Sequence, residues 1–426
     1  MVKSMKILLF EDEFTENLHP ITYTRASFEI RIGLKNMVEK IYEQLKPEKI
    51  YILCRDYIRE VVCKRYPYTI PWDGSTIDDI LIINGLLCLG ERELKEIMKI
   101  ISTKDSVLIS NGRIVAAHIS ENILKNNVLE KIHDIKKIQN LLETFRSDSV
   151  RIISYPWQLV KYSLEVFVEE FNSYSQDSSN LGDNVYVRGS RDNVKIDENT
   201  YIEPSVLIDV RKGPVYIGRN VEVEYQSRIA GPAYIGRDSI IYGARIESSI
   251  IGEVCRIGGE VVNSVISRYS NKRHFGFLGH SFIGEWVNLG AGFTNSNLKN
   301  TYGTVKMKIG DKLIDTGETF VGCFIGDHVR ASIGTLLYTG KKIGVASQIH
   351  GIVVRDVPCF TFYAKSLGVE MIELEFGDVL KSISRMMARR NIELSEAEVS
   401  LLRKVYELSR EERVKEGVKK ERIKIE

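Results

Sequence analysis

The chain has 426 residues, of which 43% are hydrophobic and 27% charged, a balance typical of a folded protein with two domains. Lys and Arg number 59 against 57 Asp and Glu, and the net charge of +2 argues against a nucleic-acid-binding protein. No apolar run of about 18 residues predicts a membrane helix, and the chain turns acidic before a signal-peptide core could form. The six cysteines form no C-x-x-C pair, so we expect reduced thiols in a cytoplasmic protein.

The first 172 residues alternate apolar runs, which predict buried strands, with helical patterns. This alternation is typical of an α/β domain with a largely parallel, Rossmann-like sheet. A further helix follows Tyr155-Pro156-Trp157 and ends near Phe171, and the polar stretch 173–184 predicts a linker. The predicted strands are 6–10, 49–54, 80–84, 106–110 and 113–118, and the predicted helices are 33–45, 56–65, 91–101 and 128–145.

Between about residues 194 and 358 the apolar pattern has a period of six. Aliphatic residues occupy every sixth position from Ile217 to Ile241, and again from Ile325 to Ile349. This period fits neither an α-helix nor an alternating strand, and is typical of a β-helix in which each hexapeptide forms one side of a triangular coil. We therefore predict an all-β, left-handed parallel β-helix, with Gly or Asn at corners that need a positive φ, rather than a β-sandwich with frequent turns.

Two stretches, 246–275 and 297–320, interrupt this period, and we interpret the second as a loop that leaves the coil. After Pro358 two amphipathic helices are predicted at 378–391 and 395–408, the second with Ser395 as its N-cap. The expected domains are an α/β domain at 1–172, a linker at 173–184, a β-helix at 185–360 and a C-terminal helical extension at 361–426.

Histidine and small residues gather in one segment of the predicted β-helix. His274 and His280 flank this segment, and Gly290, Ala291 and Gly292 follow. Acyl transfer from a thioester to an amine needs a base, which histidine can provide, and backbone N–H donors, which exposed glycines can provide. Small residues also leave room for a long thioester cofactor. The alternative is that both histidines have only a structural role, in packing or in local hydrogen bonds.

The stretch 270–300, SNKRHFGFLGHSFIGEWVNLGAGFTNSNLKN, resembles the acetyltransferase region of the bifunctional UDP-N-acetylglucosamine diphosphorylase/glucosamine-1-phosphate N-acetyltransferases, the GlmU-like proteins. It resembles still more closely a divergent branch described as sugar nucleotidyltransferases. The resemblance includes LFEDEFTENLHPITYTRASFEIRIG, Tyr155-Pro156-Trp157, Ile325-Gly-Asp-His328 and Met387-Ala-Arg-Arg390. It implies a nucleotidyltransferase-like N-terminal domain, and a homotrimer with acetyl-CoA sites between neighbouring subunits.

The resemblance also implies roles for individual residues. His274 takes the position of the general base that deprotonates the sugar amine, and Asn288 that of an asparagine that contacts the sugar. Asn297 matches an asparagine near the reacting amine. Ala291, between Gly290 and Gly292, matches the alanine beside acetyl-CoA.

Two features of the family have no counterpart in this chain. Phe277 replaces a tyrosine whose hydroxyl contacts the substrate. The lysine that binds the sugar phosphate is also missing, although Glu260 aligns with the glutamate before it. An arginine fork suits a phosphate, so we expect one nearby basic residue to replace that lysine. The candidates are Arg273, Arg256, Arg268 and Lys272.

The N-terminal domain departs further from the family, whose members hold nucleotide phosphates with a glycine-rich loop, an arginine and acidic Mg²⁺ ligands. Arg25 matches the frame of that loop, but residues 11–16 read Glu-Asp-Glu-Phe-Thr-Glu. Four carboxylates would repel phosphates. Two interpretations remain. Either Arg25 and Arg31 take part in an altered chemistry in which acidic residues such as Asp12 bind Mg²⁺ beside a nucleoside triphosphate, or the domain has lost catalysis. We favour lost or altered catalysis.

Three functions compete. The favoured one is an acetyl-CoA-dependent N-acetyltransferase that acts on an amino-sugar phosphate similar to glucosamine 1-phosphate, in nucleotide-sugar biosynthesis. The second is a sugar-1-phosphate nucleotidyltransferase of the UDP-N-acetylglucosamine diphosphorylase type, in which the β-helix mainly forms oligomers. The third is a non-catalytic subunit that senses sugar nucleotides or assembles partners. The sequence names neither the amino sugar nor a set of metal ligands.

Overall fold

The computed structural model describes residues 5–74, 78–124, 138–173 and 185–421. Most of the predicted linker and of the predicted helix at 128–145 lies outside these residues. Within them, no helix has the length and apolar character needed to cross a membrane. The six cysteines are free thiols, as predicted. The chain divides into two compact units, Met1–Leu18 with Arg25–Tyr155 (unit 1) and His19–Thr24 with Pro156–Glu426 (unit 2).

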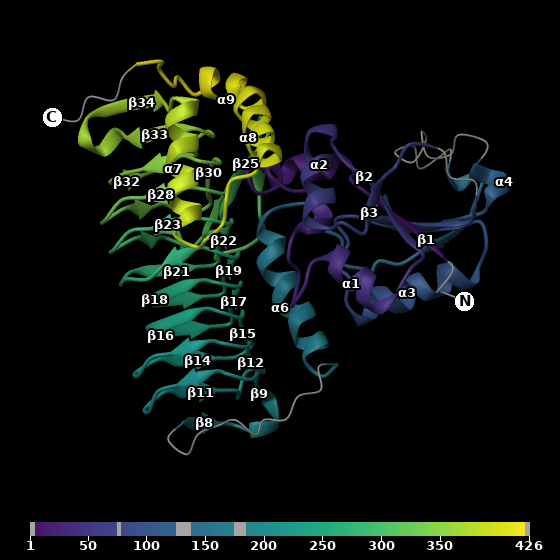
Figure 1. The fold of residues 1–426 in the computed structure, drawn as a ribbon, viewed down its shortest axis with the longest axis horizontal. Coiled ribbons are helices and arrows are strands. Elements are labelled where there is room, and N and C mark those ends of the chain that lie inside the picture. Colours follow the sequence, from purple (N-terminus) through teal and green to yellow (C-terminus); the bar gives the residue numbers. More distant parts are fainter. Residues whose placement is uncertain (1–4, 75–77, 125–137, 174–184, 422–426) are drawn as a thin grey trace. The chain divides into compact units, whose positions relative to one another are not determined.

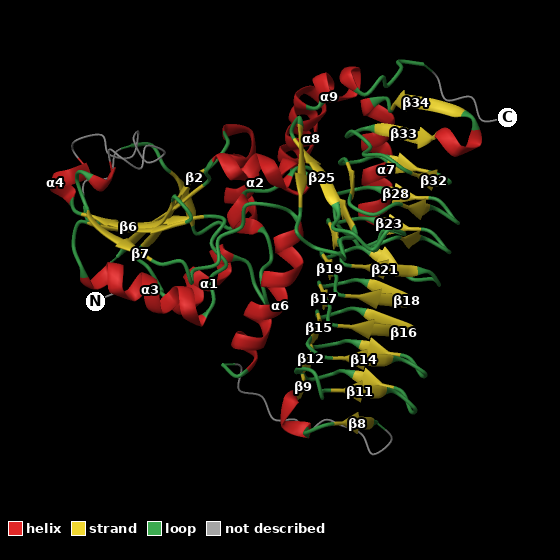
Figure 2. Ribbon diagram, turned by 180° about the vertical axis from the view of Figure 1, so that it is seen from behind, coloured by secondary structure: helices red, strands yellow, loops and turns green. Residues whose placement is uncertain are grey.

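Unit 1 contains one sheet of seven strands in the order β3-β2-β1-β4-β6-β5-β7, with helices beside it (Figures 1 and 2). The sheet is mostly parallel, as predicted, and β6 is the exception because it pairs antiparallel with both neighbours. The strands are β1 Lys6–Phe10, β2 Lys49–Leu53, β3 Thr69–Pro71, β4 Ile80–Asn84, β5 Ser106–Ser110, β6 Arg113–Ile119 and β7 Glu143–Arg146, and the helices are α1 Met37–Gln44, α2 Asp56–Arg65, α3 Glu91–Ser102 and α4 Glu121–Leu124.

Local sequence explains the reversal at β6. Asn111 and Gly112, which join β5 to β6, have φ values of 49° and 69°. A two-residue turn with both φ values positive joins antiparallel neighbours and is too short for a parallel crossover. The prediction of a helix at 128–145 is wrong at its C-terminal end. Residues 143–146 form strand β7 instead, because they pair in parallel with β5.

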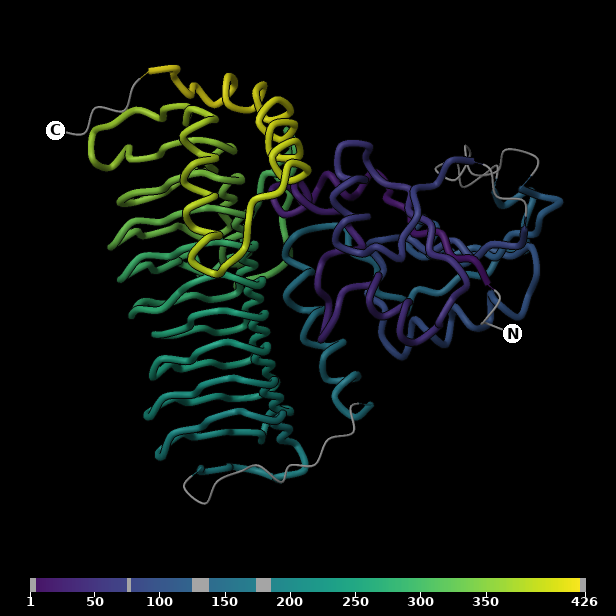
Figure 3. Tube along the Cα trace, in the orientation of Figure 1, coloured from purple at the N-terminus to yellow at the C-terminus, as the bar shows by residue number. Residues whose placement is uncertain are grey.

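Unit 2 is a parallel β-helix followed by three helices, and its coils follow one another along a single axis (Figures 1 and 3). We name its three faces A, B and C in the order in which the chain crosses them. Face A contains β9 Val194–Ile196, β12 Val215–Ile217, β15 Ala233–Ile235, β17 Ile250–Ile251, β19 Val265–Ile266, β22 Phe282–Ile283, β27 Cys323–Ile325 and β30 Lys341–Ile343.

Faces B and C share two long strands, β16 Ile240–Glu247 and β18 Arg256–Val262, which cross from one face to the other. Face B otherwise contains β10 Tyr201–Ile202, β13 Glu222–Val223, β20 Asn271–Lys272, β23 Asn288–Leu289, β28 Arg330–Ala331, β31 Gln348–Ile349 and β33 Thr361–Ala364. Face C otherwise contains β8 Tyr186–Arg188, β11 Leu207–Asp209, β14 Arg228–Ala230, β21 Phe277–Gly279, β24 Thr294–Asn295, β29 Leu336–Leu337 and β32 Ile352–Val353.

The interior of the β-helix consists of aliphatic columns, which produce the six-residue period in the sequence. On face A the inward position repeats in register, for example Ile217 with Ile235 and Ile325 with Ile343. Each fully buried isoleucine contributes roughly 2 to 3 kcal/mol of hydrophobic stabilisation. The inward isoleucines of this face are Ile196, Ile217, Ile235, Ile251, Ile266, Ile283, Ile325 and Ile343, all with at most 2% of their surface exposed.

At the corner between faces A and B the prediction of Gly or Asn holds for Asn199 and Asn220, with φ values of 57° and 56°, but it is wrong for later coils. There Val254, Tyr269, Trp286 and Phe360 have φ values of 59°, 63°, 59° and 56°. The N–H of each donates to a carbonyl of the preceding coil, as Tyr269 does to Glu253 at 2.9 Å, and these bonds offset the backbone strain. At the corner between faces B and C, Ser205 and Gln226 have positive φ in the first two coils, against the prediction. The later coils follow it, with Gly243, Gly259, Gly276, Gly292, Gly334 and Gly351 at positive φ.

The two interruptions of the repeat have different structures. The stretch 246–275 contains no loop; it belongs to coils in which β16 and β18 replace two short strands each. The stretch 297–320 leaves the coil, as predicted, and contains the antiparallel hairpin of β25 Lys306–Ile309 and β26 Lys312–Asp315. Lys308 Nζ and Glu416, in the chain segment after helix α9, form an ion pair at 2.8 Å.

Both predicted C-terminal helices are present, as α7 Phe376–Ala388 and α8 Glu396–Leu408, followed by α9 Arg410–Lys415. Ser395 is the N-cap of α8, as predicted, and accepts from the N–H of Glu398. Helix α6 Trp157–Phe171 clusters with the β-helix, where Phe167 lies beside Tyr234. Strand β34 Val369–Glu373 pairs antiparallel with β33 before α7 begins.

Candidate functional site

His274 lies at the corner that joins face B to face C, directly after β20. Its side chain is exposed. The next corner of the β-helix, residues 290–292, stacks directly on this one, because the N–H of Gly292 donates to the carbonyl of Phe275 at 3.0 Å. The structure therefore brings His274, Gly290, Ala291 and Gly292 together on two successive coils, as a site for base and acyl donor requires.

Close stacking of the coils explains why two of these residues are glycine. A Cβ on Gly290 would lie 2.7 Å from the carbonyl carbon of Ser332, and Gly292 has a φ of 76°. The N–H of Gly290 also donates to Ala331 at 3.0 Å, so the amides of both glycines are already bonded within the β-helix. Neither amide is therefore free to stabilise an oxyanion, the role expected of exposed glycines.

Glu260 lies on face C beside the corner of His274. It is in register with Phe277, and its backbone N–H donates to Gly276 at 3.0 Å. Its carboxylate is 3.6 Å from the guanidinium of Arg245 and its side chain is 38% exposed, so it remains accessible to a ligand.

Of the four candidates for the phosphate, Arg273 is the one with a free surface position. Its guanidinium lies 4.4 Å from the ring centroid of Tyr242, and its side chain is exposed. Arg256 donates to two backbone carbonyls, and Arg268 pairs with Glu285 at 3.0 Å. Lys272, which was also expected to reach the phosphate, points into the β-helix and is 2% exposed.

Asn288 and Asn297 do not lie at the corner of His274. Asn288 is exposed on face B, in register with Asn271 and Arg330. Asn297 lies beyond the far end of β21, where its Nδ2 is 2.8 Å from His280 Nδ1. One copy of the chain therefore presents the predicted sugar-binding asparagines on other parts of the β-helix surface.

His280 is held in place by its neighbours. It takes a φ of 53°, its N–H donates to Val262 at 3.0 Å, and its ring stacks on Phe320 at 5.2 Å. Burial lowers the pKa of His280 to about 4, so the imidazole is neutral and its Nδ1 accepts from Asn297. This pair was not predicted, although Asn297 and His280 were each noticed.

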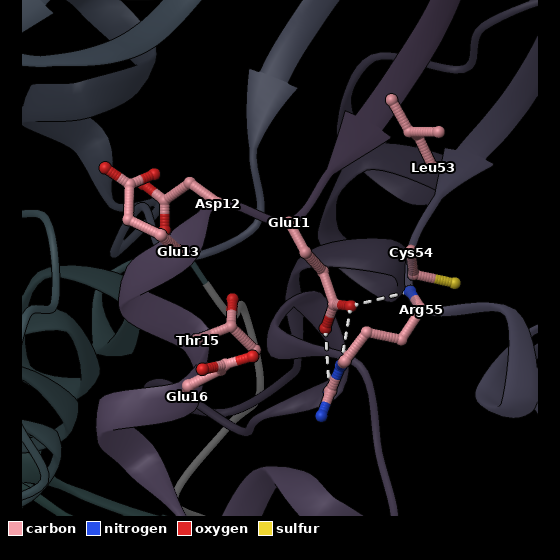
Figure 4. A pocket seen from close by; sticks show the side chains of 8 residues that line it. All are labelled: Glu11, Asp12, Glu13, Thr15, Glu16, Leu53, Cys54 and Arg55. Atoms are coloured by element: carbon pink, nitrogen blue, oxygen red, sulfur yellow. Dashed lines mark hydrogen bonds and ion pairs between the residues drawn. The ribbon is translucent and has the colours of Figure 1, made fainter. Parts of the chain in front are cut away.

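Unit 1 has a cavity of about 530 Å³ where β1 and β2 end (Figure 4). In a parallel sheet the carboxyl ends of adjacent strands form the usual ligand site. Of the three N-terminal candidates, Asp12 lines the cavity, whereas Arg25 and Arg31 are not among its lining residues. The lining residues are Glu11, Asp12, Glu13, Thr15, Glu16, Leu53, Cys54 and Arg55.

Two arginines neutralise half of the acidic loop. Arg55 binds Glu11 through Nε and Nη2, both at 3.0 Å, as Figure 4 shows. Arg113 binds Asp12 at 2.9 and 2.6 Å through Nε and Nη2. Both carboxylates are nearly buried, with side chains 6% and 7% exposed. The expected repulsion by four carboxylates is thus reduced to that of Glu13 and Glu16.

Sequence reasoning missed Arg55 and Arg113 as parts of this site. Arg55 follows β2 and Arg113 begins β6, so their positions at strand ends were the available signal. Four of the five N–H donors of Arg55 are used, because Nη1 donates to Tyr57 and Nη2 also donates to the carbonyl of Arg25. Across the described part of the chain, no group of three His, Cys, Asp or Glu side chains could hold a metal ion.

Comparison with known proteins shows which families and relatives this chain resembles. The model of the family described as sugar nucleotidyl transferase matches residues 7–179. A bifunctional sugar-1-phosphate nucleotidylyltransferase/acetyltransferase of Sulfurisphaera tokodaii is 27% identical over 84% of this chain and 100% of its own length. The bifunctional protein GlmU of Methanocaldococcus jannaschii is 24% identical over 82% of this chain and 95% of its own length.

Over most of its length the chain is similar to GlmU-like bifunctional transferases. An uncharacterised acetyltransferase of Escherichia coli, YaiX, is 29% identical over 41% of this chain and 78% of its own length. The GlmU-like relatives are named for two transferase activities, and this chain is accordingly a transferase.

Proposed function

We propose that this GlmU-like protein is an acetyl-CoA-dependent N-acetyltransferase that acts on an amino-sugar phosphate such as glucosamine 1-phosphate, in nucleotide-sugar biosynthesis. The observation that carries the proposal is the exposed His274 with the small-residue corner 290–292 stacked on it. The names of the relatives support the same class of reaction.

The residues around His274 provide the functions that this reaction needs. Acetyl-CoA supplies a thioester carbonyl that is activated toward amines. The imidazole of His274 accepts the proton that the sugar amine loses as it attacks, and this proton is then available to the sulfur that leaves as the thioester C–S bond breaks. Arg273 binds the phosphate of the sugar through its planar guanidinium, and the accessible carboxylate of Glu260 accepts from a sugar hydroxyl.

We propose further that the active form is a homotrimer. In one copy Asn288 faces outward from face B and Asn297 lies at the corner between faces C and A, while His274 lies between faces B and C. A site that uses all three residues needs a neighbouring copy to supply the missing ones. This is the arrangement that the family resemblance implies.

For unit 1 we propose that nucleotidyl transfer is lost or altered. Catalysis of this kind needs cations that bind the phosphates of a nucleoside triphosphate. The charge of Arg55 is paired with Glu11, and Glu13 and Glu16 are the exposed charges of the cavity, so the lining fits neither a free triphosphate nor, with two exposed carboxylates, a tightly bound Mg²⁺.

The test is an acetyl-transfer assay in which the free thiol released from acetyl-CoA is measured with glucosamine 1-phosphate as acceptor. We expect activity in the wild-type chain and its loss in His274→Ala. The matched control is His350→Ala, which removes a histidine of the same β-helix whose ring packs beside Phe362. Activity retained in His274→Ala, or lost equally in His350→Ala, would contradict the proposed base.

The nucleotidyltransferase activity is tested separately, by pyrophosphate release from uridine triphosphate with Mg²⁺ and N-acetylglucosamine 1-phosphate. We expect no release above the rate without the sugar phosphate. Sustained, sugar-dependent release would show instead that the acidic cavity retains the activity for which its relatives are named.

A further inference from the structure

Lys272 and Asn295 are buried polar side chains at strand positions where a neighbouring coil has an aliphatic one. Lys272 is 2% exposed and stands in register with Ile257 of the coil before it. Asn295 is 1% exposed and stands in register with Leu337 of a later coil. The partners in register show that an aliphatic side chain closes the prism at both positions, so packing alone does not require polar atoms there.

The ammonium of Lys272 holds together two successive corners between faces B and C. Its Nζ donates to the carbonyls of Gly258 at 2.8 Å, Gly276 at 2.8 Å and His274 at 3.3 Å, so all three of its protons are used. A Cβ on Gly259, which has a φ of 69°, would lie 2.8 Å from this Nζ and 2.8 Å from the carbonyl oxygen of Gly276, so this corner favours glycine. The bond to the carbonyl of His274 fixes the backbone from which the imidazole projects.

Asn295 binds the C-terminal end of strand β21, whereas Lys272 binds the residues just before that strand. Its Oδ1 accepts from the N–H of Gly279 at 2.8 Å, and its Nδ2 donates to the carbonyl of Gly279 at 3.0 Å. Its Nδ2 also donates to the carbonyl of Ser296 at 3.2 Å. The amide thus binds both backbone polar groups of the residue that precedes His280.

Both side chains therefore hold the ends of β21, the strand that separates His274 from His280. We propose that Lys272 and Asn295 are positioning residues that fix the segment 274–280 for acyl transfer. This inference rests on the proposed function. Neither residue touches a substrate; both act through the backbone on which His274 and the pair His280–Asn297 are carried.

The energetic cost of these residues supports a role beyond folding. A buried charge is destabilising unless hydrogen bonds compensate it, and replacing such a group by an apolar one is often neutral for stability. Burial lowers the pKa of Lys272 to about 8, which reflects that cost. The negative charge of Glu260 opposes this lowering of the pKa. Arg273 and His274 follow Lys272 in the chain, at the corner between faces B and C.

The experiment compares Lys272→Met and Asn295→Leu with Ile257→Met, a control for substitution in the same interior column. For each full-length variant kcat and KM for both substrates are measured in the thiol-release assay, and folding is checked by circular dichroism. We expect kcat to fall about ten- to a hundredfold in the two variants, since small displacements of a catalytic group have effects of this size. KM is expected to stay within about twofold of the wild type, because substrate contacts are unchanged.

Hydrogen exchange provides a readout that does not depend on activity. We expect faster exchange across residues 274–280 in Lys272→Met and Asn295→Leu, with unchanged exchange in Ile257→Met. Wild-type kcat in both variants, or an equal loss of kcat in Ile257→Met, would overturn the proposal. If the wild type acetylates no amino sugar, the proposed function fails; faster exchange confined to 274–280 would still support the fixing of this segment, and unchanged exchange would refute it.

Discussion

Lys272 gives the β-helix a dependence of stability on pH that has an unusual direction. Burial lowers the pKa of its ammonium from 10.5 to about 8 in the folded chain. Between these values the unfolded chain binds more protons than the folded chain, so the free energy of unfolding rises with pH across this window. Below about pH 8 both states carry the charge, and the folded state bears the full cost of burying it.

The size of the effect follows from the difference between the two pKa values. A lysine pKa of 10.5 against about 8 corresponds to about 3 kcal/mol, at roughly 1.4 kcal/mol per pH unit. Lys272 is 2% exposed, so solvent screening does not reduce this figure much. In Lys272→Met this contribution is absent at every pH.

The measurement is denaturant unfolding of the wild type and of Lys272→Met at about pH 7 and about pH 10, followed by circular dichroism. Subtracting the variant from the wild type cancels the titration of all other groups. We expect the wild type to gain about 2 to 3 kcal/mol over the variant between the two pH values, and Ile257→Met to show no such difference. A difference that stays constant with pH, or that changes in favour of the variant, would refute the assignment of a buried ammonium.

Two further predictions concern other contacts. Arg113→Leu leaves the nearly buried Asp12 without its cation, and we expect a loss of about 3 to 5 kcal/mol in unit 1, against little change in the exposed control Arg92→Leu; equal thermal unfolding of the two variants would contradict this. Gly276→Ala places a Cβ 2.1 Å from the carbonyl oxygen of Phe293 at a φ of 121°. We therefore expect loss of soluble, folded protein, and a variant with wild-type melting behaviour would show that this corner can relax.

Several elements could be predicted from sequence because they depend on neighbours along the chain. The six-residue repeat from Ile217 to Ile241 predicts the β-helix, since one inward residue recurs on each side of the coil. Ser395 predicts the start of α8, since the side chain of an N-cap residue bonds to the first turn of the helix that follows it. The Asn111-Gly112 turn also carried a local signal, and it could have predicted the antiparallel β6.

Contacts between residues far apart in the sequence were decided only by the tertiary structure. Arg113 reaches Asp12 across 101 positions, and no local pattern indicates that pairing. The corners between faces A and B accept Tyr269 and Trp286 at positive φ because the carbonyls of the preceding coil satisfy their N–H groups. Residue type alone favours glycine at a positive φ. The aromatic residues at these corners therefore depend on the stacking of the coils.

The same division applies to the candidate site. The sequence by itself determined that His274 lies in a β-helix near the small residues 290–292, because spacing and residue type carry that information. It could not show that Lys272 points inward, since coils of unequal length shift the register of each strand against the next. Only the folded coils decided this, because the direction of a side chain on a strand depends on the pairing of that strand with its neighbours.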